Sequence, residues 1–347
     1  MAIASKIRGS LLGGALGDAL GYAVEFDRLP AIRERFGSAG LQDFSQLGGP
    51  VDFSDDTQMT LYSADGLNEA LAWAREGVRA DELACVWLAY LRWLKTQGVT
   101  VPESAPQPVP RWLDAQPVMQ HQRHPGKACL SGLAGGAMGS VARPVNPDSK
   151  GCGTIMRAAP FGLIPQLAPE AVARLSTDAA ALTHGHPSAL HSSAQFSLLI
   201  HGLLLGAPLD EAVSALAGRL QDDPGTPPEL RERVLKAIDL ARAAERLSPE
   251  ALTAELGEGW VAEEAFAVAL YAVLATAGAA DPEQHLREAL ALAATHDGDS
   301  DSTASIAGNI VGALHGDGAL PPSWLASVNG IEVVDRIASE LAALVGE

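Results

Sequence analysis

Two short acidic clusters carry the side chains of this sequence that can act together in chemistry. The first is residues 54–57, Ser-Asp-Asp-Thr, and the second is residues 297–302, Asp-Gly-Asp-Ser-Asp-Ser. Neighbouring carboxylates repel one another, so a folded chain tolerates them where they face water or where a cation neutralises them. The donors in these clusters are carboxylate and hydroxyl oxygens, without thiolates or grouped imidazoles, which favours Mg²⁺ or Mn²⁺ over Zn²⁺.

Each cluster also has a simpler interpretation when it is taken alone. Ser and Asp are preferred at helix N-caps and in first turns, which would explain residues 54–57 without a ligand. The second cluster does not fit a calcium-binding loop, because its sixth position is Ser302 instead of Gly and its twelfth is Gly308 instead of Glu. Together the clusters offer four carboxylates, enough to balance two divalent cations, and two hydroxyl ligands: Asp55, Asp56, Asp299, Asp301, Ser54 and Ser302.

The elements that must position these clusters are predicted to be helices. Apolar residues recur with helical spacing and alternating strand patterns are nearly absent, so we expect an all-α fold forming a single compact domain over residues 1–347. Pro187 and Pro249 are expected at helix starts. The clearest helical stretches are residues 61–73, 83–94, 190–205, 230–244, 266–274, 306–314 and 331–344.

Two series of glycines suggest how distant helices meet. A glycine in a helix interior costs about 1 kcal/mol relative to alanine, so a stripe of glycines needs a compensating close contact. We therefore expect the two helices to pack tightly against each other and to hold the acidic clusters together. The first series is Gly9, Gly13, Gly17 and Gly21, and the second is Gly308, Gly312 and Gly316.

Composition limits the classes of function. The formal net charge of −18 repels polyphosphate, so general nucleic-acid binding is not expected. Cys85, Cys129 and Cys152 lack disulfide or zinc spacing and suit small buried positions in a reducing cytoplasm. No secretion signal is evident, and the longest apolar stretch, residues 265–280, is shorter than the ~20 residues that span a bilayer. The proline-rich residues 97–126 are expected to form a long loop, either a lid or an inert excursion, with a helical pattern only at residues 111–119.

Several motifs, in order along the chain, closely resemble the ADP-ribosylglycohydrolase family. They include the glycine-rich start, the Glu25-Phe26 pair, both acidic clusters, residues 151–157 (Gly-Cys-Gly-Thr-Ile-Met-Arg) and residues 182–187 (Leu-Thr-His-Gly-His-Pro). The resemblance covers most of the chain. It implies a compact, orthogonal multi-helix domain with two divalent cations, Mg²⁺ or Mn²⁺, that removes ADP-ribose from a modified side chain.

The same resemblance implies roles for particular residues. Ser54, Asp55 and Asp56 would hold one cation, while Asp299, Asp301 and Ser302 would hold the other, with Asp301 bridging. Glu25, Asp55, Asp56 and Asp299 are the catalytic candidates, and which carboxylate is the general base stays open. Asp18 would contact the site or cap a buried donor. The implied substrate-binding residues are Gly151, Cys152, Gly153, Thr154, Met156, His184 and His186, although Cys152 stands where relatives often have Asn. The segment of residues 151–157 is expected to open a helix, whose N-terminus would favour the anionic diphosphate.

The implied reaction is hydrolysis of the glycosidic bond at the anomeric carbon of the ribose. The expected partner is an ADP-ribosylated protein or a small ADP-ribose conjugate, and the acceptor stays open between arginine, serine, a nucleobase and a small molecule. We expect a cytoplasmic monomer that binds no membrane. One alternative is a catalytically silent relative that binds ADP-ribose or neutralises a toxin. A second, remote alternative is an isoprenoid diphosphate enzyme, which is disfavoured because Met59 stands where the first motif of such enzymes has a third Asp.

Overall fold

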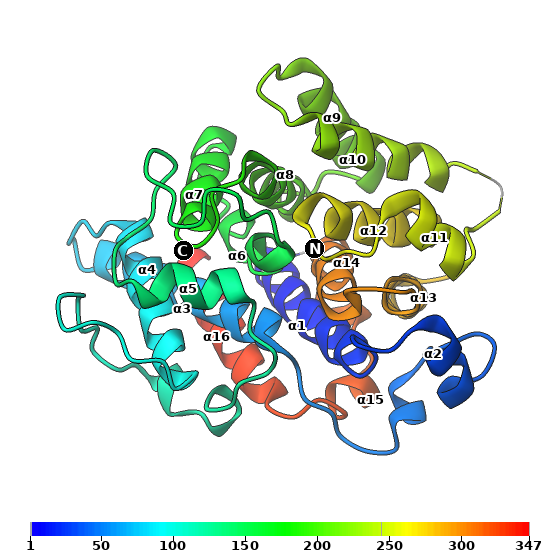
Figure 1. The fold of residues 1–347 in the computed structure, drawn as a ribbon, viewed down its shortest axis with the longest axis horizontal. Coiled ribbons are helices and arrows are strands. Elements are labelled where there is room, and N and C mark those ends of the chain that lie inside the picture. Colours follow the sequence, from blue (N-terminus) through cyan, green and yellow to red (C-terminus); the bar gives the residue numbers. More distant parts are fainter. Residues whose placement is uncertain (1, 244, 347) are drawn as a thin grey trace.

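The chain folds into helices joined by loops and short turns, as a computed structural model describing residues 2–243 and 245–346 shows (Figure 1). The described residues contain isolated β-bridges but no β-strand, so the all-α prediction is confirmed. Every predicted helical stretch lies within a helix, with two exceptions at C-terminal ends. The stretch 190–205 runs one residue past α8, and the stretch 230–244 runs past α10, with residue 244 outside the described residues. The helices of the first half are α1 (Ile3–Tyr22), α2 (Leu29–Phe36), α3 (Asp55–Arg75), α4 (Glu82–Thr96), α5 (Lys127–Ala134), α6 (Ala159–Gly162) and α7 (Pro169–Ala181). Those of the second half are α8 (Pro187–Leu204), α9 (Leu209–Asp222), α10 (Pro228–Ala241), α11 (Pro249–Leu256), α12 (Ala262–Ala275), α13 (Pro282–Ala294), α14 (Ser300–His315), α15 (Pro322–Leu325) and α16 (Ile331–Val345).

Helices α1 and α14 lie against each other in an antiparallel pair near the middle of the molecule (Figure 1). A methyl group placed on Gly17 would lie 2.0 Å from the Ala304 carbonyl oxygen, and one on Gly21 would lie 2.1 Å from that of Ser300. The two backbones therefore touch where side chains would keep them apart, which confirms the contact expected from the glycine series. This contact brings the C-terminal end of α1 next to the beginning of α14, where the second acidic cluster lies.

The interior is packed mainly from small and medium aliphatic side chains. Helix α12 shows this best, because nearly all of its residues are buried, including Phe266 and Tyr271. Among the residues that the structure describes, no helix is both long enough and apolar enough to cross a membrane.

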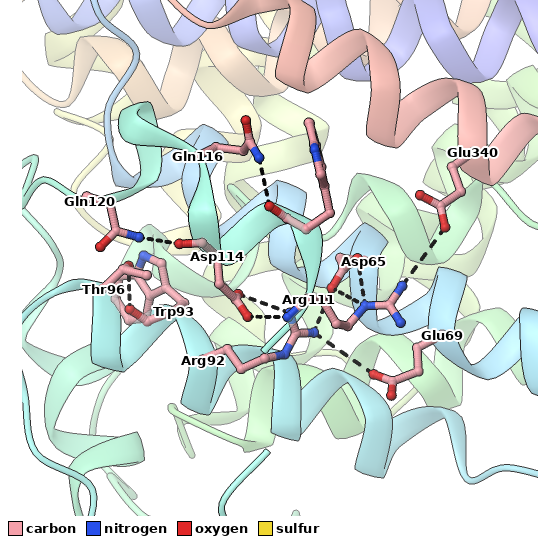
Figure 2. A network of polar contacts seen from close by, with 11 residues as sticks. Asp65, Glu69, Arg92, Trp93, Thr96, Arg111, Asp114, Gln116, Gln120 and Glu340 are labelled. Carbon is pink, nitrogen blue, oxygen red and sulfur yellow. Dashed lines mark hydrogen bonds and ion pairs between the residues drawn. The ribbon is translucent and has the colours of Figure 1, made fainter. Parts of the chain in front are cut away.

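The long loop between α4 and α5 has little regular structure. Its expected helical part, residues 111–119, forms only two short 3₁₀ turns, η2 (Trp112–Ala115) and η3 (Pro117–Met119). The Arg111 Nε donates to Asp65 of α3 at 2.9 Å, and Arg92 of α4 binds Asp114 of the loop at 3.1 Å (Figure 2). These charged contacts tie the loop to the helices before it reaches the acidic cavity described next.

Candidate metal centre and substrate cavity

The structure brings the two acidic clusters together around one cavity of about 290 Å³. Glu25 follows the end of α1, and Asp299 and Asp301 lie at the beginning of α14. Each of these three buried residues offers a carboxylate oxygen, and the three oxygens lie within 4.8 Å of one another. Asp55 and Asp56, in the first turn of α3, line the same cavity.

Among the residues that the structure describes, no arginine or lysine forms an ion pair with the carboxylates of this cavity. Burial, followed by the charges of Asp301 and Asp55, raises the pKa of Glu25 to about 9. Burial and the charge of Asp301 likewise raise the pKa values of Asp55, Asp56 and Asp299 well above the usual range. The Glu25 Oε2 and Asp56 Oδ2 atoms are buried without a hydrogen-bond partner. Oxygen donors with unmet charge and unmet bonding capacity fit hard divalent cations.

Asp18 binds the backbone of the first acidic cluster. Its carboxylate, fully buried on α1, accepts from the backbone N–H of Ser54 at 2.8 Å and from that of Thr57 at 2.9 Å. Burial, and next the charge of Asp301, raises the pKa of Asp18 to about 7. Asp18 thus caps two donors at the beginning of α3 and does not line the cavity, whereas the sequence left both roles open.

The hydroxyl groups of the clusters differ in position. Ser302 lines the cavity. Ser54 is the N-cap of α3, and its Oγ accepts from the Asp56 N–H at 3.1 Å. The helix-capping interpretation of residues 54–57 therefore holds together with the clustering of carboxylates, because the same turn does both.

Most of the substrate-binding candidates also reach the cavity. Gly151, Cys152, Gly153, Met156 and His184 line it. Two candidates do not line it and make structural contacts instead. The Thr154 hydroxyl donates to the Ala189 carbonyl at 3.1 Å, and His186 caps α8 by accepting from the Ser188 N–H at 3.1 Å.

Residues 150–153 are held by the chain before α12. The Cys152 N–H donates to the Trp260 carbonyl at 3.2 Å, and the Ala262 N–H donates to the Lys150 carbonyl at 2.9 Å. We expected this segment to open a helix, but it forms only the 3₁₀ turn η4 (Cys152–Thr154), because its backbone pairs with a neighbouring segment. Backbone amides rather than a helix end are therefore available to an anion here.

His184 stands in the cavity wall as a neutral imidazole. Burial, and next the charge of Arg157, lowers its pKa to about 3. Its Nδ1 lies 2.8 Å from the Thr183 hydroxyl, which also accepts from Arg157 at 2.6 Å. The side chain is thus fixed in orientation and suited to hydrogen bonding instead of ion pairing.

Cys152 is placed differently from the other two cysteines. Cys85 and Cys129 are buried, as expected, whereas Cys152 is only half-buried. Both Cys129 and Cys152 line the cavity. Its thiol donates to Asp299 Oδ2 at 2.8 Å. The clusters contain no thiol in sequence, but the fold supplies one at the second cluster.

Comparison with known proteins identifies the family. A family model described as ADP-ribosylglycohydrolase matches residues 1–347. The chain belongs to the ADP-ribosylglycohydrolase family. It is 27% identical to ADP-ribosylhydrolase ARH3 of Danio rerio, over 97% of this chain and 90% of that one. It is 26% identical to ADP-ribosylarginine hydrolase Tri1 of Pseudomonas putida, over 97% of this chain and 77% of that one. A solved structure titled ADP-ribosylglycohydrolase-related protein complex shares the fold, with a TM-score of 0.69, 24% identity and 99% coverage of both chains.

This member of the family has cavity residues that sequence reasoning missed. Trp260 and His124 line the cavity, and Phe26 lies between them, with ring centroids 6.5 Å from Trp260 and 4.8 Å from His124. Trp260 is 40% exposed and Phe26 is 64% exposed. A tryptophan directly after Gly-Glu-Gly was the signal for an exposed aromatic group. His124 gives no such signal, because its positive φ of 57° is visible only in the structure.

Lys127 is a further cavity residue that sequence reasoning missed. It is the first residue of α5 and lines the cavity, where the preceding Gly126 N–H donates to Asp55 Oδ2 at 3.3 Å. The loop of residues 97–126 therefore ends at the acidic centre. A larger cavity of about 560 Å³ lies between α3 and α7, but its lining mixes leucines with charges of both signs and includes none of the acidic clusters.

Proposed function

We propose that this protein is a metal-dependent hydrolase that removes ADP-ribose from a modified side chain or small acceptor. The bond cleaved is the glycosidic bond at the anomeric carbon of the ribose. The proposal rests on one observation, made in a chain that belongs to the ADP-ribosylglycohydrolase family. Five carboxylate residues from distant parts of the chain line one cavity: Glu25, Asp55, Asp56, Asp299 and Asp301. We further propose that residues 1–347 act as one domain and as a monomer.

Two divalent cations, Mg²⁺ or Mn²⁺, are proposed as cofactors. Ser54, Asp55 and Asp56 would hold one cation, and Asp299, Asp301 and Ser302 would hold the other. When bound, the cations supply a positive field that orients the ribose hydroxyls and favours charge development at the anomeric carbon. The unpartnered Asp56 Oδ2 and the mutual repulsion of the buried carboxylates support this assignment.

The proton transfers are assigned to the chain's own carboxyl groups. Glu25 is protonated at neutral pH in the cation-free protein, because its pKa is about 9, and its proton suits the leaving atom of the acceptor. Bound cations would lower that pKa. Asp55, Asp56 or Asp299 would accept the proton of the attacking water. The water oxygen then forms the new bond to the anomeric carbon as the acceptor departs.

The rest of the cavity is proposed to hold the ADP-ribose. The backbone N–H groups of Gly151 and Gly153 can donate to diphosphate oxygens, and the Lys127 ammonium adds a positive charge to the lining of the same cavity. His184, neutral and fixed, is suited to a hydroxyl of the ribose. The aromatic rim of Phe26 and Trp260 would lie outside these polar contacts, against the adenine or the acceptor.

The group from which ADP-ribose is removed is to be found by experiment. Of the similar proteins, Tri1 is named for arginine-linked ADP-ribose, and ARH3 is named without an acceptor. The function is tested by incubating the purified chain with ADP-ribosyl-arginine, ADP-ribosyl-serine and small ADP-ribose conjugates, with Mg²⁺ or Mn²⁺ and with chelator. We expect release of ADP-ribose that requires the cation.

Asp301→Asn is the decisive variant for this assay. Loss of outer partners of a metal site typically costs about 10–100-fold, so loss of a proposed ligand should cost at least about 100-fold in kcat/KM. Circular dichroism checks that the variant is folded. Binding of ADP-ribose without turnover of any conjugate would instead favour the catalytically silent alternative.

A further inference from the structure

Arg157 is a buried cation that forms no ion pair with a carboxylate among the described residues. Its side chain is 1% exposed, and its guanidinium lies over the Tyr90 ring, 4.5 Å from the centroid. Its polar neighbours are neutral, and the shortest contact is with Thr183, whose hydroxyl oxygen accepts from Arg157 Nη2 at 2.6 Å. A buried charge without an opposite charge is costly, so Arg157 is a candidate for a functional role.

The single hydroxyl proton of Thr183 has two possible acceptors. His184 Nδ1 lies 2.8 Å from the Thr183 oxygen, and the Ala180 carbonyl oxygen lies 3.5 Å from it. The Ala180 carbonyl already accepts from the backbone N–H groups of Thr183 and His184, at 3.2 and 3.0 Å. A strong O–H hydrogen bond is no longer than about 3.0 Å, so the hydroxyl donates to His184 Nδ1. With the proton on Nδ1 instead, Thr183 would be left with only the long contact for its own proton.

This arrangement places the proton of His184 on its other ring nitrogen. Burial, and next the charge of Arg157, lowers the pKa of His184 to about 3, so its imidazole carries one proton at neutral pH. Because Nδ1 accepts, that proton is on Nε2, which has no hydrogen-bond partner among the described residues. A methyl group placed on Gly151 or Gly153 would lie 3.5 Å from Nε2. The two glycines therefore leave Nε2 uncovered, in a cavity that all three residues line.

We infer that Arg157 and Thr183 are positioning residues, which hold His184 with its proton on Nε2 so that this N–H donates to an oxygen atom of bound ADP-ribose. A ring nitrogen that carries a proton cannot bind a cation, so His184 serves the sugar nucleotide and not the proposed metal centre. The identity of the ligand rests on the proposed function, whereas the position of the proton does not.

The proton is located by ¹⁵N NMR of the full-length protein with labelled histidine. The His184 signals are assigned by their loss in His184→Phe. In the wild type we expect a pyrrole-type signal for Nε2 and a pyridine-type signal for Nδ1. In Thr183→Val, Nδ1 loses its donor, so we expect the proton to be shared between the two nitrogens. Thr183→Ser keeps the hydroxyl and should restore the wild-type signals.

Calorimetry with ADP-ribose measures the consequence for binding. Loss of one oriented hydrogen bond should weaken binding about 3- to 10-fold in Thr183→Val and in His184→Phe, while Thr183→Ser binds as the wild type does. In the hydrolysis assay, Thr183→Val should raise KM and leave kcat nearly unchanged. Thr276→Val is the matched control, because this buried hydroxyl donates to the Ala272 carbonyl at 2.7 Å and the residue does not line the cavity. It should change neither the His184 signals nor the affinity.

The inference is overturned if wild-type His184 carries its proton on Nδ1, or if a folded Thr183→Val protein keeps either the wild-type signals or the wild-type affinity. If circular dichroism shows Thr183→Val to be unfolded, the wild-type spectrum and the affinity of His184→Phe decide the same question. Failure of the proposed function gives a different result. Thr183-dependent ADP-ribose binding with the proton on Nε2, but without hydrolysis, supports the inference and rejects that function. Cation-dependent hydrolysis with the proton on Nδ1 supports the function and rejects the inference.

Discussion

Helix α3 buries aspartates at two places, and the two places differ in what faces them. Asp65, in the middle of the helix, meets Arg92 at 2.6 Å and Arg111 at 2.9 Å (Figure 2). Asp55 and Asp56, at its beginning, meet further carboxylates from α14 and no arginine or lysine ion pair among the described residues. One helix therefore carries a balanced charge cluster and an unbalanced one.

The difference separates a structural use of buried charge from a functional one. A buried carboxylate is costly unless a partner repays its lost hydration, and Arg92 and Arg111 do this for Asp65. At the other place no described arginine or lysine forms such a pair, and we propose that divalent cations supply the opposite charge. Burial and charge alone would not distinguish the two clusters, whereas the sign of the neighbouring charges does.

Removing Arg92 should have the largest effect on stability. Arg92→Met leaves Asp65 with the half-buried Arg111 and leaves Asp114 without this partner, so we expect a loss of about 3–5 kcal/mol in the free energy of unfolding. Urea denaturation measures the change. The exposed pair Arg242 and Asp239 is the control, because Arg242→Met should change little. An Arg92 variant as stable as the wild type would show that the balanced cluster is not structural.

The stability of the protein should depend on pH through the unbalanced cluster. Burial raises the folded-state pKa of Glu25 from 4.5 to about 9 and that of Asp18 from 3.8 to about 7. The folded chain thus holds protons that the unfolded chain releases, so the stability of the cation-free protein is greatest below about pH 4 as far as these groups decide it. It should fall as the pH rises to about 9.

Divalent cations should oppose this loss. At neutral pH, Mg²⁺ or Mn²⁺ at 100 times its Kd should add about 2.7 kcal/mol to the free energy of unfolding. Thermal unfolding followed at several pH values, with cation and with chelator, measures both effects. Stability that rises between pH 5 and pH 9 in chelator would contradict the unbalanced character of the cluster.

The sequence was sufficient for part of this picture. The helices, the glycine contact and the two acidic clusters could be predicted, because each shows in the spacing of residues that are close together in the sequence. The counter-charges of Asp65 could not be predicted, because Arg111 reaches it from an irregular loop. The thiol beside Asp299 was equally hidden, since Cys152 is far from residues 297–302 in sequence. The helix expected after Gly151 was wrong because pairing with residues 260–262 competes for the same backbone groups.

The position of the unbalanced cluster should depend on the glycine contact between α1 and α14. In Gly17→Ala, the new methyl group would lie 2.0 Å from the Ala304 carbonyl oxygen, so the backbones must separate at a cost of about 1–3 kcal/mol. Gly218→Ala on α9 is the matched control, because open space surrounds that glycine and alanine is the better helix former by about 1 kcal/mol. Separation of α1 from α14 also moves Glu25 away from Asp299, so Gly17→Ala should weaken Mn²⁺ binding in calorimetry while Gly218→Ala leaves it unchanged. Unchanged Mn²⁺ affinity in a folded but destabilised Gly17→Ala protein would mean that the acidic turns are held by their own contacts, such as the Asp18 cap of α3, and not by the helix pair.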